Sequence, residues 1–107
     1  MAPTDYDLQI LLDLATARQE IKAGWWFKIE ARRVSPPGQV PDDIRYSLTL
    51  HDPDNNRVLG FDNDHQYHHR HRPDGSVTNY TFSTCGDLAT AFFDVVDTYL
   101  TGINVLP

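Results

Sequence analysis

Residues 57–72 read RVLGFDNDHQYHHRHR, and the rest of the chain is organised around this stretch. It begins with the alternation of a strand, turns at a polar Asp-Asn-Asp corner (residues 62–64), and continues with histidines and arginines. Side chains two residues apart on a strand point to the same face. We therefore expect His69 and His71 to share one face of a strand, with Arg70 on the other.

Segments on both sides of this stretch alternate between apolar and polar residues, which is typical of half-buried strands. Clusters of proline, glycine and aspartate separate them and supply the turns. An antiparallel sheet built in this way can pack one face against helices and leave the other to solvent or to a partner. The expected strands span residues 25–32, 44–51, 57–62, 67–72 and 77–82.

Both ends of the chain carry the pattern of a capped helix. Thr4 and Thr84 each stand three residues before an aspartate, which resembles a capping box. Helical spacing of apolar residues predicts one helix over residues 5–20, whose last third also fits a short extended edge, and another from Thr84 to Gly102. The order predicts an α+β fold, with an antiparallel sheet of about five strands between an N-terminal and a C-terminal helix. We expect a single domain over residues 1–107.

Composition narrows the functional classes. The 107 residues carry a formal net charge of −6, which argues against broad electrostatic binding to nucleic acid. Two basic stretches, residues 22–33 and 70–72, would form a local basic patch if they fold against each other. The single cysteine, Cys85, excludes an internal disulfide and a multi-thiolate zinc site. No apolar run approaches the ~18 residues of a membrane span, so we expect a cytoplasmic protein without a membrane partner.

The histidine-rich strand and the corner before it provide the candidate catalytic residues Asp62, Asn63, His69, Arg70 and His71. Paired imidazoles can serve as general base and general acid at neutral pH, because the unperturbed pKa of histidine lies near ~6.5. An adjacent arginine binds phosphate and stabilises charge in the transition state. Arg70 could do so if the strand bends enough to bring it round. Such a site suits metal-independent RNA cleavage through the 2′-hydroxyl group.

The same residues fit two other interpretations. His69, His71 and Asp62 would supply an open three-ligand site for zinc or a similar divalent metal, although their spacing matches no fixed zinc pattern. Alternatively, a solvated strand simply carries these histidines together with His65 and His68, and their mutual repulsion is tolerated. The residues alone leave all three interpretations open.

The strand that begins at Trp25 offers a second candidate surface. If Trp26 points outward beside Lys28 and Arg32, its ring could stack on a nucleobase while the cations follow the phosphate backbone. The structural alternative is that one tryptophan belongs to the core and the other packs under a loop.

Five short motifs stand in order over residues 44–97. They are a Tyr-x-Leu strand at residues 46–48, Gly-Phe-Asp-Asn at 60–63, His-Arg-His at 69–71, Tyr-x-Phe at 80–82 and Leu-x-x-x-Phe at 88–92. Together they resemble the TumE family, small proteins described as toxins of bacterial toxin-antitoxin pairs. The N-terminal helix lies outside the resemblance, and His68 stands where an acid is more usual.

The resemblance implies a toxin component and a partner antitoxin, a DNA-binding protein encoded nearby. It implies no mechanism, so RNA cleavage or RNA binding by the His-Arg-His strand is a hypothesis from the residues. One alternative is a non-catalytic interaction module whose open sheet face binds an antitoxin or another chain, including a second copy in a homodimer. Another is a metal-dependent hydrolase with a His/Asp site.

Overall fold

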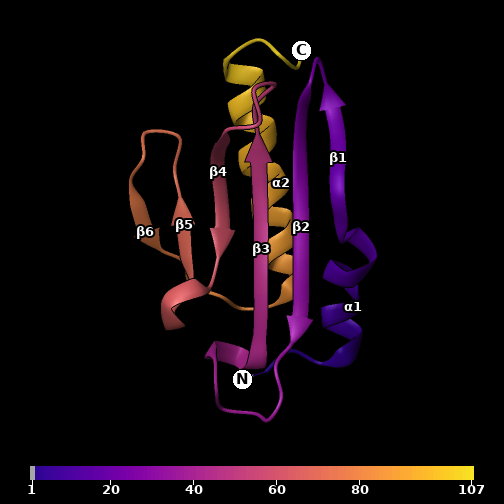
Figure 1. The fold of residues 1–107 in the computed structure, drawn as a ribbon, viewed down its shortest axis with the longest axis vertical. Helices are drawn as coiled ribbons and strands as arrows, with labels where there is room; N and C mark the ends of the chain where they lie inside the picture. Colours follow the sequence, from indigo (N-terminus) through magenta and orange to yellow (C-terminus); the bar gives the residue numbers. More distant parts are fainter. Residues whose placement is uncertain (1) are drawn as a thin grey trace.

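A single antiparallel sheet, in which each strand pairs with its neighbours in sequence, forms the framework of the computed structural model (Figure 1). The structure describes residues 2–107. Within them the class is α+β as predicted, but the sheet has six strands rather than about five. In spatial order these are β1 (Thr16–Lys22), β2 (Trp25–Arg33), β3 (Ile44–His51), β4 (Arg57–Asp62), β5 (His69–His71) and β6 (Val77–Asn79).

The two α-helices of residues 2–107 are α1 (Asp5–Leu14) and α2 (Cys85–Gly102). Both begin as predicted, because the hydroxyl oxygens of Thr4 and Thr84 each accept a hydrogen bond of 3.0 Å from the backbone N–H three residues on. The Asp7 carboxylate of α1 accepts bonds from the first N–H groups of α2, at 2.7 and 3.2 Å. This contact joins the two helices, since an anion is stabilised at a helix N-terminus. Neither helix is long and apolar enough to cross a membrane.

The segment after α1 corrects the predicted helix over residues 5–20. The helix ends at Leu14, and Thr16–Lys22 form β1, the extended edge that the weak periodicity also allowed. The hairpin to β2 turns at Ala23 and Gly24, which both have positive φ, at 54° and 87°. That backbone matches a type I′ turn, and a glycine at the second position adopts it at no steric cost.

The strands β5 and β6 are shorter than the predicted segments 67–72 and 77–82. Beyond the ladder, one hydrogen bond of 3.1 Å from the Tyr80 N–H to the His68 carbonyl continues the pairing. Short strands next to turns expose much of their backbone, and all three residues of β6 are exposed.

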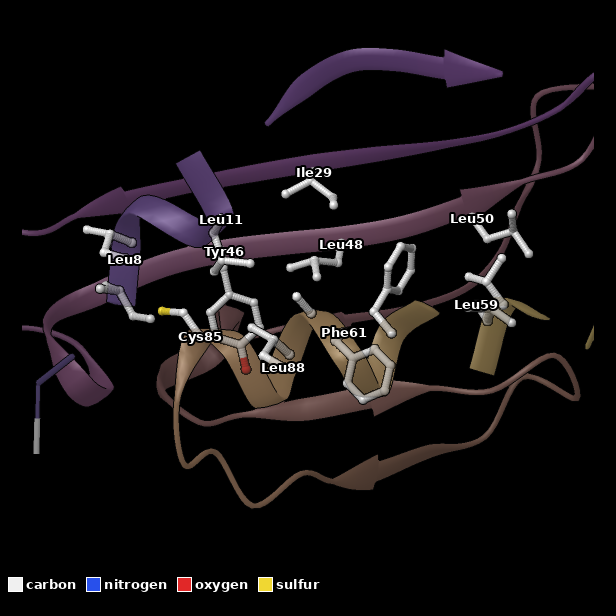
Figure 2. Close-up of a cluster of buried hydrophobic side chains, with 14 of the residues drawn as sticks. Leu8, Leu11, Ile29, Tyr46, Leu48, Leu50, Leu59, Phe61, Cys85 and Leu88 are labelled. Atoms are coloured by element: carbon white, nitrogen blue, oxygen red, sulfur yellow. The ribbon is translucent and has the colours of Figure 1, made fainter. Parts of the chain in front are cut away.

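The hydrophobic core lies between the sheet and the helices. Strand alternation places Leu48, Leu50, Leu59 and Phe61 on the helix-facing side, where they pack against Leu88 and its neighbours on α2 (Figure 2). Each fully buried side chain of this kind contributes about 1.5–3 kcal/mol of transfer free energy. The core also includes Leu8, Leu11, Ile29, Ile44, Tyr46, Cys85, Ala89, Phe92, Val96 and Leu100.

The other face of the sheet, which we call the open face, carries the polar residues of the central strands. Register pairs Ser47 of β3 with Asp62 of β4, and Asp62 with His69 of β5. The next row across the same face contains Thr49, Gly60 and His71. The fold therefore brings the corner residue Asp62 beside the histidine strand, on the face opposite the core.

Candidate active site

Asp62 lies between two imidazoles on the open face. Its Oδ1 is 2.5 Å from Nε2 of His69 and its Oδ2 is 3.0 Å from Nε2 of His71. The two rings are 4.8 Å apart between centroids, which is closer than the repeat of about 6.4–6.8 Å between alternate residues of a strand. The carboxylate is almost fully buried and also accepts a bond of 3.2 Å from the Asp64 N–H. We call Asp62, His69 and His71 the carboxylate-histidine cluster.

His69 is buried, with 3% of its surface exposed. Its Nδ1 lies 3.1 Å from the Tyr67 carbonyl oxygen, and a carbonyl can only accept a hydrogen bond, so Nδ1 carries a hydrogen. Its Nε2 faces a carboxylate oxygen of Asp62, which is also an acceptor. Each nitrogen of the His69 ring therefore faces an oxygen that can accept a hydrogen bond. The burial of His69 makes it a fixed support for that carboxylate.

His71 is the more accessible imidazole of the cluster, with 21% of its side chain exposed. Its Nδ1 is 3.5 Å from a guanidinium nitrogen of Arg57, which can only donate. Nδ1 therefore holds the lone pair and Nε2–H donates to Asp62. Burial and then the charge of Arg57 lower the pKa of His71, although Asp62 opposes them. The geometry and the pKa direction both favour a neutral imidazole whose Nδ1 lone pair accepts a long hydrogen bond from Arg57.

Arg57 was missed by the sequence analysis. It lies fourteen residues before His71, and only the pairing of β4 with β5 brings the two side chains together. The sequence feature that could have pointed to Arg57 is its position at the start of the strand that ends in Asp62. It places positive charge next to the His71 lone pair, where an anionic substrate group would be stabilised.

Asn63, a predicted site residue, is fully buried beneath the cluster. Its side-chain amide donates to the Ile44 carbonyl at 2.6 Å, and its Oδ1 accepts from the Tyr46 N–H at 3.2 Å. Arg45 donates to the backbone carbonyl of Asn63 at 2.8 Å. These bonds satisfy the backbone groups of β3 beyond the point where its pairing with β4 ends. Asn63 therefore fixes the chain at the corner that follows Asp62.

Arg70 lies on the opposite face of β5 from the two imidazoles. It pairs in register with Phe61, whose side chain is in the core, and its guanidinium carbon is 5.7 Å from the centroid of that ring. β5 runs in regular register through Arg70, so no bend brings it to the cluster. The structure thus joins Asp62, His69 and His71 and separates Arg70 from them.

His68 is held apart from the cluster by packing. Its ring stacks on Tyr46 and Phe82, with centroids 5.6 and 4.8 Å away. Its Nδ1 is 2.8 Å from the Tyr46 hydroxyl and its Nε2 is 2.6 Å from an Asp42 carboxylate oxygen. His68 therefore ties the loop before β5 to β3. The side chain of His65 lies outside the described part of the structure.

Trp26 lies on the open face but offers no ring surface to a nucleobase. The His51 ring stacks on one side at 3.9 Å, with 7° between the planes, and the Arg18 guanidinium carbon is 4.5 Å from the ring centroid. The indole N–H donates to Asn55 at 3.1 Å, and 9% of the residue is exposed. The prediction of Trp26 as a stacking platform is therefore not supported by its surroundings.

A hollow of about 520 Å³ opens beside the cluster on the same face. Its wall includes Ser47, the register partner of Asp62, and the two cations Arg32 and Arg45. Glu30 and Asp64 contribute opposite charge to it. Because Ser47 pairs in register with Asp62, the hollow lies one strand away from the carboxylate-histidine cluster.

The cluster also has the donor set of a metal site. One ligand atom each from Asp62, His69 and His71 lies within 4.8 Å of the others. Two imidazoles and a carboxylate are the protein ligands of many catalytic zinc sites, which keep a fourth position for water. The bond from His69 Nδ1 to a backbone carbonyl is the support that metal-bound histidines usually have. The three residues therefore supply the donor set of a divalent metal site.

The fold and cluster define a small α+β protein with a carboxylate-histidine site on an open sheet face. A family model described as Toxin TumE matches residues 12–100, which run from late α1 to near the end of α2. The chain therefore belongs to the TumE toxin family, and the resemblance seen in its motifs is confirmed. No curated protein and no solved structure matches it. Membership identifies a toxin component, and a toxin of this kind implies an antitoxin partner in general.

Proposed function

We propose that this toxin cleaves RNA, with His71 as general base and the open face as the substrate surface. The observation that carries the proposal is the geometry of His71. Its Nε2–H is held by the buried Asp62 carboxylate, while its Nδ1 lone pair faces Arg57. A base oriented by a carboxylate and placed beside a cation is the arrangement that general-base attack on a phosphodiester needs.

In this proposal the exposed Arg57 side chain moves from His71 Nδ1 to the phosphate, and Nδ1 takes the proton of a ribose 2′-hydroxyl. The 2′-oxygen then attacks the adjacent phosphorus, and the bond to the 5′-oxygen breaks. Water donates the proton that this leaving oxygen needs, and the product end is a 2′,3′-cyclic phosphate. Asp62 stabilises the imidazolium that forms on His71, and Arg57 contacts the non-bridging oxygens.

His69 has a different role in this proposal from the general acid or base that a pair of imidazoles suggests. Its burial and its two hydrogen-bond contacts support a positioning role, in which it fixes the orientation of the Asp62 carboxylate. Arg70 receives no part in proton transfer, because it lies across the sheet. The phosphate contacts come instead from Arg57 at the cluster and from Arg32 and Arg45 in the hollow. These three arginines give the open face local positive charge, although the net charge of the whole protein is −6.

The test uses purified protein and a single-stranded RNA oligonucleotide in the presence of a metal chelator. We expect cleavage with 2′,3′-cyclic phosphate ends, and no cleavage where the ribose at the scissile position is 2′-deoxy. Inducing the wild type in bacteria should arrest growth, whereas a folded His71→Gln variant should not. Intact RNA after incubation with a folded, growth-arresting wild type would reject the proposal.

A second candidate is supported by the donor set of the cluster. If Asp62, His69 and His71 bind a divalent metal, the metal would supply an activated water, and the activity would be metal-dependent hydrolysis. Calorimetric titration with zinc near neutral pH separates the two candidates. Stoichiometric binding in the wild type that is lost in His69→Ala, with cleavage abolished by chelator, favours the metal. Chelator-resistant cleavage rejects it.

We propose that the partner is an antitoxin, and that this antitoxin is a DNA-binding protein encoded beside this gene. Membership in a toxin family supports an antitoxin partner in general. Co-expression of the neighbouring reading frame should relieve growth arrest and yield a complex on size-exclusion chromatography. A neighbouring product that neither binds the toxin nor relieves the arrest would contradict this.

A further inference from the structure

A second hollow, of about 320 Å³, lies on the helix-covered side of the sheet, between α2 and the hairpin of β5 and β6. We call it the Arg70 groove. It has no residue in common with the carboxylate-histidine cluster. Its walls combine apolar and polar side chains, and they consist of Leu59, Arg70, Pro73, Asp94, Val95, Thr98 and Tyr99.

Arg70 is the unusual member of this groove. Its Nε is buried and makes no hydrogen bond within residues 2–107. The guanidinium faces the Phe61 ring, and no carboxylate of the described chain forms an ion pair with it. A buried donor without a partner is costly, by about 1–3 kcal/mol and more for a charged group. A cation–π contact offsets part of that cost but leaves the Nε–H unpaired.

The nearest charged groups do not supply the missing partner. Asp94 lines the same groove but is exposed and forms no ion pair with Arg70. Arg72, on the same hairpin, adds like charge, and burial with this neighbour lowers the pKa of Arg70. The site is therefore set up to gain from an anion that approaches from outside.

The surroundings select the kind of anion. The apolar wall formed by Leu59, Val95 and the Tyr99 ring suits aliphatic side chains, and Asp94 at the rim repels a polyanion such as a nucleic acid backbone. The volume is at the low end of ligand pockets and has room for one or two side chains of a peptide. An apolar segment that carries one carboxylate complements both the walls and the cation.

We propose that the Arg70 groove binds an apolar peptide segment of a protein partner, and that Arg70 pairs with a carboxylate on that segment. The contact lies across the sheet from the carboxylate-histidine cluster and does not depend on RNA cleavage. A partner bound here leaves the open face accessible, so partner binding and substrate binding use different surfaces.

The test follows the Arg70 Nε–H resonance by NMR while two peptides are added, N-acetyl-Leu-Leu-Glu-amide and its Gln counterpart. We expect the Glu peptide to shift that resonance and those of Val95 and Tyr99, and to bind roughly tenfold more tightly than the Gln peptide, because the added hydrogen bond is charge-assisted. The preference should disappear in Arg70→Met and persist in the matched control Arg72→Met.

Two results would overturn the proposal. One is equal binding of the Glu and Gln peptides to the folded wild type, or no binding of either. The other is stronger binding at Arg70 by inorganic phosphate or a uridine oligonucleotide than by the Glu peptide, which would make the groove a phosphate site. If Arg70→Met fails to fold, Arg70→Gln keeps a polar side chain without the charge, and it should lose the preference as well.

Discussion

Replacing Asn63 by alanine tests whether this predicted site residue has a structural role. The structure predicts that the change lowers the free energy of unfolding by a large amount. The side chain is fully buried, and its two hydrogen bonds satisfy the Ile44 carbonyl and the Tyr46 N–H. Asn63→Ala leaves both backbone groups buried without a partner, at about 1–3 kcal/mol each. The expected loss in the free energy of unfolding is therefore about 2–6 kcal/mol, out of a total that is typically ~5–15 kcal/mol for a small domain.

Urea unfolding followed by circular dichroism measures this loss, and a thermal scan should show a midpoint lower by about 10 °C or more. The matched control is Asn79→Ala on the exposed strand β6, which should stay within about 0.5 kcal/mol of the wild type. If Asn63→Ala unfolds at the wild-type urea concentration, the two hydrogen bonds do not fix the corner. The stability argument for Asn63 would then be refuted.

Three further outcomes follow from the structure. Gly60→Ala should destabilise the fold by about 1–3 kcal/mol in the same urea assay, since its Cβ would lie 2.7 Å from the Leu48 carbonyl oxygen; an unchanged midpoint would contradict this. Burial and the nearby Asp7 carboxylate raise the pKa of Cys85 to about 12, so the thiol should not react with Ellman's reagent at pH 8 until urea unfolds the protein. The lowered pKa of His71 keeps the neutral base present at lower pH, so RNA cleavage should decline only as pH falls below ~6.5, and a midpoint above that value would argue against His71 as the base.

Local rules were enough for much of the fold. The threonine caps and the helical spacing of apolar residues located α2, and the period of two located β3 and β4 with the bounds that the structure has. The same alternation placed His69 and His71 on one face and Arg70 on the other. These features depend on neighbours along the chain, and a single sequence contains that information.

The first strand illustrates why other elements could not be predicted. The pairing of β1 with β2 shifts register between Thr16 and Gln19 and again between Glu20 and Lys22. Each irregularity disrupts the inside-outside alternation, so no clear period of two appears in the sequence. Without a strand signal, the helical pattern of α1 extends into residues 15–20 in the prediction. The predicted helix is therefore longer than α1, which ends at Leu14.

The site could be predicted in its residue types but not in their roles. Asp62 lies beside the imidazoles because β4 pairs with β5 in one particular register. That register could not be predicted from the sequence. The approach of Arg57 to His71, the stacking of His68 on Tyr46 and Phe82 and the burial of Asn63 all depend on contacts between distant segments. Such contacts are set by the tertiary fold, and the spacing of residues along the chain does not predict them.

The most direct test of the central claim is the single-turnover rate of RNA cleavage by His71→Gln relative to the wild type, in chelator. Glutamine keeps an N–H that can donate to Asp62, but its amide oxygen is not basic enough to replace Nδ1 as a proton acceptor. The variant therefore removes the base and keeps a side chain of similar size. His51→Gln, on the same face outside the cluster, is the matched control and should keep the wild-type rate. We expect His71→Gln to be slower by about 10²- to 10⁴-fold with an unchanged circular dichroism spectrum. A folded His71→Gln protein that cleaves at the wild-type rate would contradict the assignment of His71 as the base.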